Sequence, residues 1–264
     1  ASSSTVTLND PTAISLSTSQ TVAISCAGFN DGQANASASG GTGTLSYLWS
    51  DGQNTATATN LSAGSYTVTV TDNNGCSSTS SVTLTDPPGM ASSAAVSSAY
   101  NGADISCFGA SDGEMTATVS GGTPGYSFLW SDGQTNAIAS GLVAGAYTVT
   151  ITDQSGCTTV STASVTQPTA LNLASTSSPT LCNGDANGSV TAAATGGTGT
   201  YTYNIGSGGQ ASPTFSGLTA GNYTVTATDV NGCVATSTVA VSQPALLSAS
   251  TSASADPNCN GGAD

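Results

Sequence analysis

The chain contains no lysine, arginine or histidine, and its 14 acidic residues give it a net charge of −14 at pH 7. Proteins that bind nucleic acids need cationic side chains to neutralise phosphates. A uniformly negative chain also repels nucleic acid and anionic lipid. We therefore expect no nucleic-acid partner.

The missing residue types also remove most catalytic machinery. Without histidine or lysine there is no Ser-His-Asp or Cys-His pair, no Schiff-base lysine and no imidazole metal ligand. Glu114 is the only glutamate, and it lies near Asp112 in a single part of the chain. A carboxylate pair for glycoside hydrolysis at that one place is not expected. The sequence predicts that the protein is not an enzyme.

Long apolar runs and helical periodicity are absent as well. No apolar stretch reaches the roughly 18 residues of a membrane-spanning helix, so membrane insertion is not expected. Aromatic residues make up only 5% of the chain. What is present is alternation of apolar residues with Thr or Ser, as in TVTVTD, TVTITD and TVTATD. This period of two, with β-branched residues, predicts an all-β fold.

The chain repeats itself in units of about 80 residues that open at Pro11, Pro87, Pro168 and Pro244. A repeat of this kind indicates an array of similar domains. The predicted boundaries are residues 1–10 for the last strand of a truncated preceding repeat, 11–86 for repeat 1, 87–167 for repeat 2, 168–243 for repeat 3, and 244–264 for the start of a truncated fourth repeat.

Each unit has an alanine-rich alternating segment and then a bulky one. The predicted inward positions are Ala34, Ala36 and Ala38, Met115, Ala117 and Val119, and Val190, Ala192 and Ala194 in the first segments, and Leu45, Tyr47 and Trp49, Tyr126, Phe128 and Trp130, and Tyr201, Tyr203 and Ile205 in the second. We expect these residues to form the cores.

Two aromatic positions suggest the type of sandwich. Trp49 and Trp130 end the bulky segments, and Tyr66, Tyr147 and Tyr223 lie in L-x-A-G-x-Y. A buried Trp on a middle strand and a tyrosine corner are features of immunoglobulin-like domains. We therefore predict tandem immunoglobulin-like β-sandwiches in an extended array, with these residues as core and corner.

The combined pattern resembles a known repeat. It reads C-x-G-x-x-[DN]-G, then GGT-x-x-Y-x-[YF]-x-W-S-D-G, then L-x-A-G-x-Y-T-V-T-x-T-D-x-x-G-C. This pattern resembles the SprB-type repeat, which occurs in very large cell-surface adhesins of gliding bacteria and in related exported proteins. Repeat 3 departs from the pattern, because Ile205 replaces the Trp. The resemblance implies display on the outer surface and a link to attachment or gliding.

Seven cysteines recur at two positions of the repeat. No C-x-x-C spacing occurs, which argues against zinc. Paired cysteines indicate an oxidising compartment outside the cytoplasm, so we expect a secreted protein at the cell surface. One bridge per repeat is the simplest interpretation, with Cys259 unpaired in this segment. The predicted bridges are Cys26–Cys76, Cys107–Cys157 and Cys182–Cys233.

Asp72, Asp153 and Asp229 recur in T-D-x-x-G-C, once per repeat. An Asp at such a place can accept hydrogen bonds from the amides of its own turn. Calcium is the alternative, since carboxylates without cationic partners attract divalent ions. No D-x-D-x-D run supports calcium, so the turn interpretation is favoured and no cofactor is assigned.

The tandem repeats, together with what the SprB resemblance implies, predict a structural stalk or filament segment of a secreted bacterial cell-surface adhesin. Its partners would be neighbouring repeats of the same long chain, other chains in a fibre, and a surface or glycan ligand bound by a distal region. The alternative is a carbohydrate- or ice-binding module that uses Thr-rich faces such as Thr55, Thr57 and Thr59. The equivalent residues are Asn136, Ile138 and Ser140 in repeat 2, and Ser212, Thr214 and Ser216 in repeat 3, which argues against this alternative.

Overall fold

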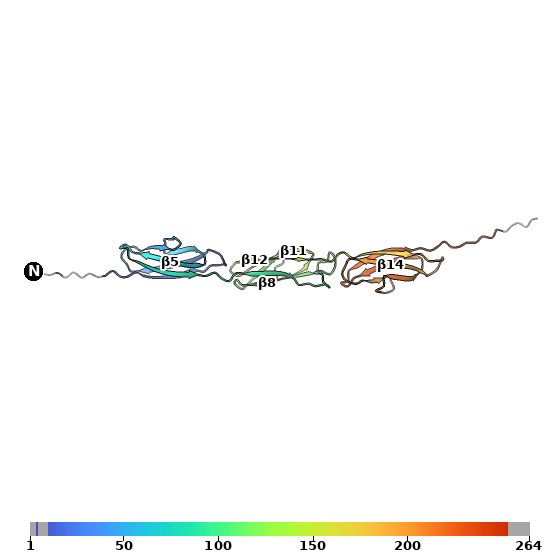
Figure 1. Ribbon diagram of the computed structural model, residues 1–264, viewed down its shortest axis with the longest axis horizontal. Helices are drawn as coiled ribbons and strands as arrows, with labels where there is room; N and C mark the ends of the chain where they lie inside the picture. The colour runs from blue at the N-terminus through green and yellow to red at the C-terminus, as the bar shows by residue number, and fades with distance from the viewer. Residues whose placement is uncertain (1–3, 5–9, 253–264) are drawn as a thin grey trace, which may run out of the picture. The chain divides into compact units, whose positions relative to one another are not determined.

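The computed structural model (Figure 1) describes residues 4 and 10–252 and places them in strands, turns and coil. Eighteen strands and no helix occur among these residues. The described part of the chain thus contains no helix that could cross a membrane. The predicted all-β fold is confirmed.

Repeat 1 forms two three-stranded antiparallel sheets, β1-β2-β4 and β3-β5-β6. Sequence neighbours β2 and β3 lie in different sheets, as in a sandwich. The strands are β1 (Ser15–Val22), β2 (Gly32–Ser39), β3 (Ser46–Trp49), β4 (Thr57–Leu61), β5 (Gly64–Thr71) and β6 (Ser77–Leu84).

The same order recurs in the next two repeats, as β10-β8-β7 with β12-β11-β9, and as β13-β14-β16 with β15-β17-β18. Repeat 2 has β7 (Ala91–Val96), β8 (Gly113–Ser120), β9 (Ser127–Trp130), β10 (Ile138–Leu142), β11 (Gly145–Thr152) and β12 (Thr158–Val165). Repeat 3 has β13 (Asn172–Ser178), β14 (Gly188–Thr195), β15 (Thr202–Asn204), β16 (Thr214–Leu218), β17 (Gly221–Thr228) and β18 (Val234–Val241).

By contact density the chain divides into two compact units, and the division runs through repeat 2. The first unit consists of Ala1–Ser97, Glu114–Ser140 and Gly145–Ser164. The second consists of Ser98–Gly113, Gly141–Ala144 and Val165–Asp264. Because the units do not coincide with the repeats, the predicted repeat boundaries stay a prediction.

The period-two patterns position the cores as expected. On β2 the buried residues are Ala34 and Ala36, and on β5 they are Val68 and Val70. Trp49 pairs with Val68 across β3 and β5. These residues belong to one apolar cluster in repeat 1, while the intervening Thr and Ser face outward. Small inner residues on one sheet face large ones on the other.

The tryptophans are core residues, as predicted. Trp49 and Trp130 are each 1% exposed. The Trp49 indole Nε1 donates to the Thr55 carbonyl at 2.9 Å, which satisfies its one buried polar group. In repeat 3, Ile205 is only half-buried and the neighbouring Tyr203 is buried instead.

The predicted tyrosine corners are also present. The Tyr66 hydroxyl donates to the Ser62 carbonyl at 3.1 Å, and the Tyr223 hydroxyl donates to the Thr219 carbonyl at 2.9 Å. Tyr147 is half-buried at the equivalent position of β11. Each of these two hydrogen bonds ties the entry of the penultimate strand to the residue four positions earlier, as in an immunoglobulin-like corner.

The first testable prediction concerns Trp49. Trp49→Ala should lower the free energy of unfolding of repeat 1 by about 3–5 kcal/mol, because it removes a large buried ring and leaves a cavity. The neighbouring Leu48 is 58% exposed, so Leu48→Ala is the matched control and should change it by no more than about 0.5 kcal/mol. Urea unfolding followed by circular dichroism checks this, and equal effects of both changes would contradict the core assignment.

Candidate functional site

Each repeat carries its two cysteines on two different turns. The first-strand turn follows the first strand of the repeat and spans residues 23–31, 97–112 and 179–187 in the three repeats. The Asp turn joins the last two strands and spans residues 72–76, 153–157 and 229–233.

In repeat 1 these two turns lie at opposite ends of the sandwich. Gly32, which follows the first-strand turn, is paired with Leu61 and packs beside Leu84, the last residue of β6. Asp72, which begins the Asp turn, instead contacts the β2–β3 turn at Thr42. Strands of eight residues separate the two ends, which is about 25 Å at 3.3 Å per residue.

This separation makes the predicted bridges within a repeat wrong. A disulfide needs Cα atoms within about 7 Å, so Cys26 cannot reach Cys76 across the folded sandwich. The structure joins consecutive repeats instead. The bridges are Cys26–Cys157 and Cys107–Cys233, with Cα–Cα distances of 5.7 and 5.6 Å.

Cys76 and Cys182 are free and exposed, whereas they too were predicted to be bridged. The prediction for Cys259 lies outside the described residues. In both observed bridges, a first-strand turn is joined to the Asp turn of the following repeat. We call each such contact a junction.

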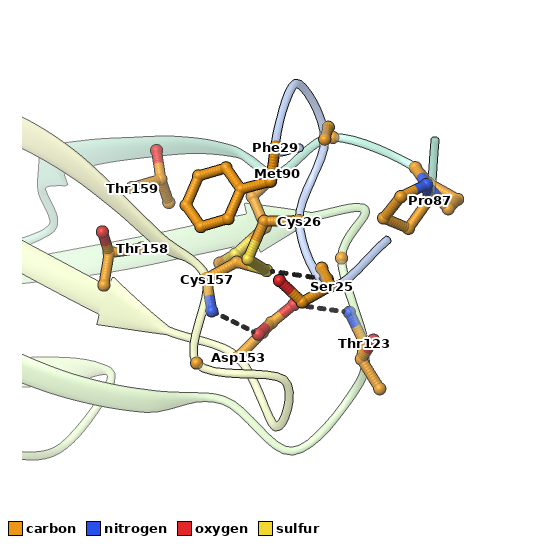
Figure 2. Close-up of a pocket in the computed structure, with 15 residues that line it drawn as sticks. Ser25, Cys26, Phe29, Pro87, Met90, Thr123, Asp153, Cys157, Thr158 and Thr159 are labelled. Atoms are coloured by element: carbon orange, nitrogen blue, oxygen red, sulfur yellow. Dashed lines mark hydrogen bonds between the residues drawn. A yellow bond between two sulfur atoms is a disulfide. The ribbon is translucent and has the colours of Figure 1, made fainter. Parts of the chain in front are cut away.

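Figure 2 shows the first junction, which lies within the first compact unit. The Cys157 sulfur lies 3.3 Å from the Ser25 carbonyl oxygen. Beside the bridge is a cleft of about 300 Å³, lined in part by Phe29, Pro87 and Met90. Phe29 is 54% exposed although it borders this cleft. The ring of Phe29 is therefore only partly covered at this junction.

The second junction has an additional polar contact within the second compact unit. The Asn231 side-chain amide donates to the carbonyls of Tyr100 and Ser106 at 3.2 and 3.1 Å, and its oxygen accepts from Asn101. Tyr100 and Ala103 close a tight turn that is absent from the shorter first-strand turns of the other repeats. Asn101 has a φ of 50°, which Asn tolerates in such turns.

The recurring aspartates position the cysteines of the Asp turns. Asp153 is 5% exposed, and its Oδ1 accepts from the Cys157 amide at 2.9 Å while Oδ2 accepts from the Thr123 amide at 2.8 Å. The hydrogen bond from Thr123 is the main reason why the pKa of Asp153 lies below its usual value. Figure 2 shows both contacts.

Asp72 and Asp229 repeat this arrangement with the amides of Cys76 and Cys233, each at 2.9 Å. The hydrogen bond from the Thr42 amide lowers the pKa of Asp72 in the same way. The predicted Asx-type turn is confirmed. Both carboxylate oxygens accept hydrogen bonds from backbone amides, so these residues hold the turn. The described residues contain no cluster of three or more potential metal ligands.

An Asp or Asn side chain also closes each first-strand turn, a role that the sequence analysis did not assign. Asp31 Oδ1 accepts from the Ser25 amide at 3.1 Å, and Asn187 Oδ1 accepts from the Leu181 amide at 2.9 Å. In repeat 2, Asp112 holds the Ser106 amide at 3.0 Å. The held amide always belongs to the residue before the cysteine. This role could have been predicted from the Asp or Asn that precedes the last glycine of the C-x-G-x-x-[DN]-G motif.

Linker residues also hold the first-strand turns, which the sequence analysis did not identify. Gln167 Oε1 accepts from the Gly109 amide at 2.9 Å, and Gln243 Oε1 accepts from the Gly184 amide at 3.0 Å. Gly109 has a φ of 77°, a conformation that favours glycine. The recurrence of Gln before the linker proline in repeats 2 and 3 was the available signal.

The remaining candidate residues make contacts within the fold. Thr55 is exposed, but its hydroxyl donates to the Thr57 carbonyl at 2.6 Å, and the Thr57 hydroxyl donates to Asn35 at 3.2 Å. Thr59 is half-buried on β4. Glu114 accepts from the Ser97 hydroxyl at 2.8 Å. These groups serve contacts within the fold.

The Asp turns give the second prediction. A carboxyl whose pKa is lower in the folded state stabilises the fold above its unfolded value of about 4, and this stabilisation is lost as the pH falls through the folded pKa. The free energy of unfolding should therefore decrease below about pH 4. Asp72→Asn and Asp153→Asn should each reduce this dependence. Thermal unfolding between pH 2 and 6 measures it, with Asn73→Ala as a control that keeps every carboxylate; an unchanged profile in both Asp variants would contradict the assignment.

The junctions give the third prediction, which uses the absence of lysine and arginine. Gly89→Lys creates the chain's one trypsin site, in the exposed linker before Met90. A Cβ at Gly89 would meet only Ala27, at 3.7 Å. After cleavage, residues 1–89 should stay attached through Cys26–Cys157 and separate only on reduction.

Electrophoresis with and without reductant measures this separation. Adding Cys26→Ser to Gly89→Lys should release the fragment without reductant. Release from Gly89→Lys alone without reductant would indicate bridges within the repeats and would contradict the junction.

Comparison with known proteins supports the sequence assignment. The SprB repeat family matches residues 18–54, 99–135 and 174–210. Each matched segment contains the cysteine of a first-strand turn and ends before the Asp turn. A search of curated proteins found no match.

Structures of immunoglobulin domains are among the solved structures that are similar to the chain. The mouse nectin-like molecule 4 ectodomain, Ig1–Ig3, is 12% identical with a TM-score of 0.32, covering 90% of this chain and 97% of that one. The N-terminal eight Ig domains of Down Syndrome Cell Adhesion Molecule are 12% identical with a TM-score of 0.37, covering 89% and 45%. A structure reported for Dscam isoform specificity is 11% identical with a TM-score of 0.28, covering 90% and 74%. The SprB repeat model is thus detected at three places in the chain, in agreement with the resemblance seen in the sequence.

Proposed function

We propose that this chain is a load-bearing stalk segment of a secreted bacterial cell-surface adhesin, in which disulfides join each SprB repeat to the next. The observation that carries the proposal is the connectivity of the two bridges, Cys26–Cys157 and Cys107–Cys233. A bridge within a domain stabilises only that domain. A bridge between consecutive domains transmits tension past the linker.

The overlap of the two bridged loops adds to this argument. Every peptide bond between Cys26 and Cys233 lies inside at least one disulfide-closed loop. A single proteolytic cut in that span therefore leaves the chain covalently whole. In the chain-entropy account, closing loops of 131 and 126 residues stabilises the folded state by about 5 kcal/mol each.

The family and the chemistry support the location. SprB repeats are typical of adhesin-type repeat regions at the cell surface, and disulfides persist in oxidising compartments. The absence of lysine and arginine leaves no site for trypsin-like proteases outside the cell. Reach and mechanical continuity for attachment or gliding are the functions that such a segment would serve.

The fourth prediction tests the mechanical role by pulling the chain from both ends. When every repeat of the oxidised chain has unfolded, the shortest covalent path runs through residues 1–26, 107–157 and 233–264. This path has roughly 110 residues and a length of about 370 Å, while the whole reduced chain reaches about 900 Å.

Single-molecule force spectroscopy with and without reductant measures both lengths. Cys26→Ser with Cys107→Ser is the matched variant and should reach the longer length without reductant. Extension of the oxidised parent chain to the full length would show that the bridges do not carry load, and would overturn the proposal.

A further inference from the structure

Among the described residues, two cysteines remain outside the observed junctions, and both are exposed: Cys76 and Cys182. They differ in type. Cys76 is on the Asp turn of repeat 1, a position whose equivalents Cys157 and Cys233 are both bonded to a preceding repeat. Cys182 is on the first-strand turn of repeat 3, a position from which bonds are made to a following repeat.

The turn that carries Cys76 has the geometry of a bridged Asp turn without having a bridge. Asp72 Oδ1 accepts from the Cys76 amide at 2.9 Å, the same distance as at Cys157 and Cys233. Asn74 occupies the position of Asn231, whose side chain contacts the preceding repeat at the second junction. The half-site for a first-strand turn is thus preformed.

The turn that carries Cys182 is equally complete. Asn187 holds the Leu181 amide, and Gln243 holds the Gly184 amide. Asn183 donates to the Pro244 carbonyl at 3.1 Å, which ties the turn to the outgoing linker. Leu181 is 79% exposed next to the free thiol. The half-site for an Asp turn is therefore ordered and uncovered.

We propose that Cys76 and Cys182 are the two open halves of one further junction, each taking its complement from another SprB repeat. A second copy of this chain offers both complements, so Cys182 of one copy would bond to Cys76 of another, head to tail. This inference rests on the proposed function, since it extends the same bridge beyond the segment. Because the two halves are different surfaces, copies of this chain would join head to tail into an open ladder or a ring, and not into a symmetric pair.

The bond forms by thiol–disulfide exchange with a small disulfide oxidant such as glutathione disulfide. The Cys182 thiolate attacks the oxidant and releases one glutathione thiolate. The Cys76 thiolate then attacks the mixed disulfide and releases the second. Two protein thiols are oxidised to one disulfide, and one glutathione disulfide is reduced to two glutathiones, which take up the two protons.

The test uses the full chain with Cys259→Ser, so that a cysteine outside the described residues does not compete. Oxidised with glutathione disulfide, this chain should form a ladder of covalent multimers on non-reducing gels. Mass spectrometry of non-reduced peptides, cut by a protease that needs neither lysine nor arginine, should find Cys76 joined to Cys182.

Two single variants separate this junction from general thiol reactivity. Cys76→Ser alone and Cys182→Ser alone should each remain monomeric, while an equal mixture of the two should give a dimer and nothing larger. Dimers formed by either variant alone as readily as by the mixture, or the absence of any ladder, would overturn the inference.

The same peptide map distinguishes this failure from a failure of the proposed function. Internal peptides that join Cys26 to Cys157 without any multimers would overturn only the further junction. Absence of the internal peptides would instead overturn the junctions on which the proposed function rests.

Discussion

The length of a β-strand is the constraint on which the covalent architecture depends. An eight-residue strand separates the two cysteine-bearing turns of repeat 1 by about 25 Å, several times the span of a disulfide. The first-strand turn can therefore bond only to something beyond its own sandwich. The chain leaves β6 at this same end, so the next repeat supplies the partner. Covalent continuity between repeats follows from where the strands end.

The hydrogen bonds around each bridge show how a weakly apolar interface can still be specific. On one side a buried Asp holds the cysteine amide, and on the other an Asp or Asn holds the amide of the residue before the cysteine. Both cysteines are thus presented by turns that are rigid before the bond forms. This preorganisation lowers the entropy that the bond must offset. A large apolar contact is not needed, and Phe29 remains half exposed at the first junction.

Most of the fold could be predicted from the sequence, because it depends on local periodicity. The alternation in TVTVTD placed Val68 and Val70 inside, and the position of Trp49 within its strand placed it in the core. The Asp turn could be predicted as well, since an Asx-type hydrogen bond involves residues within four positions. These features require no knowledge of which strands pair.

The cysteine pairing could not be predicted, because it depends on strand direction. The equivalents of Cys26 and Cys76 recur at matching positions of every repeat, with nearly the same spacing, and this regularity favoured a bridge inside the repeat. The strand pairing shows that β4 runs antiparallel to β2, while β3 begins at the β2–β3 turn. Both β3 and β4 therefore run away from this turn, although they lie in different sheets. The two turns consequently end up at opposite ends. Periodicity shows which face a residue occupies, but not which end of the domain it reaches.

The connectivity also favours one order of folding and oxidation. In an unfolded chain, closing the loop of about 50 residues between Cys26 and Cys76 costs less entropy than closing the 131-residue loop to Cys157, by about 1 kcal/mol. An oxidant that acted on the nascent, unfolded chain would favour the wrong bond. The native bond becomes favoured only after the sandwich has formed and moved the competing thiol out of reach. Correct pairing is therefore favoured when folding precedes oxidation, because the folded sandwich keeps Cys26 and Cys76 apart.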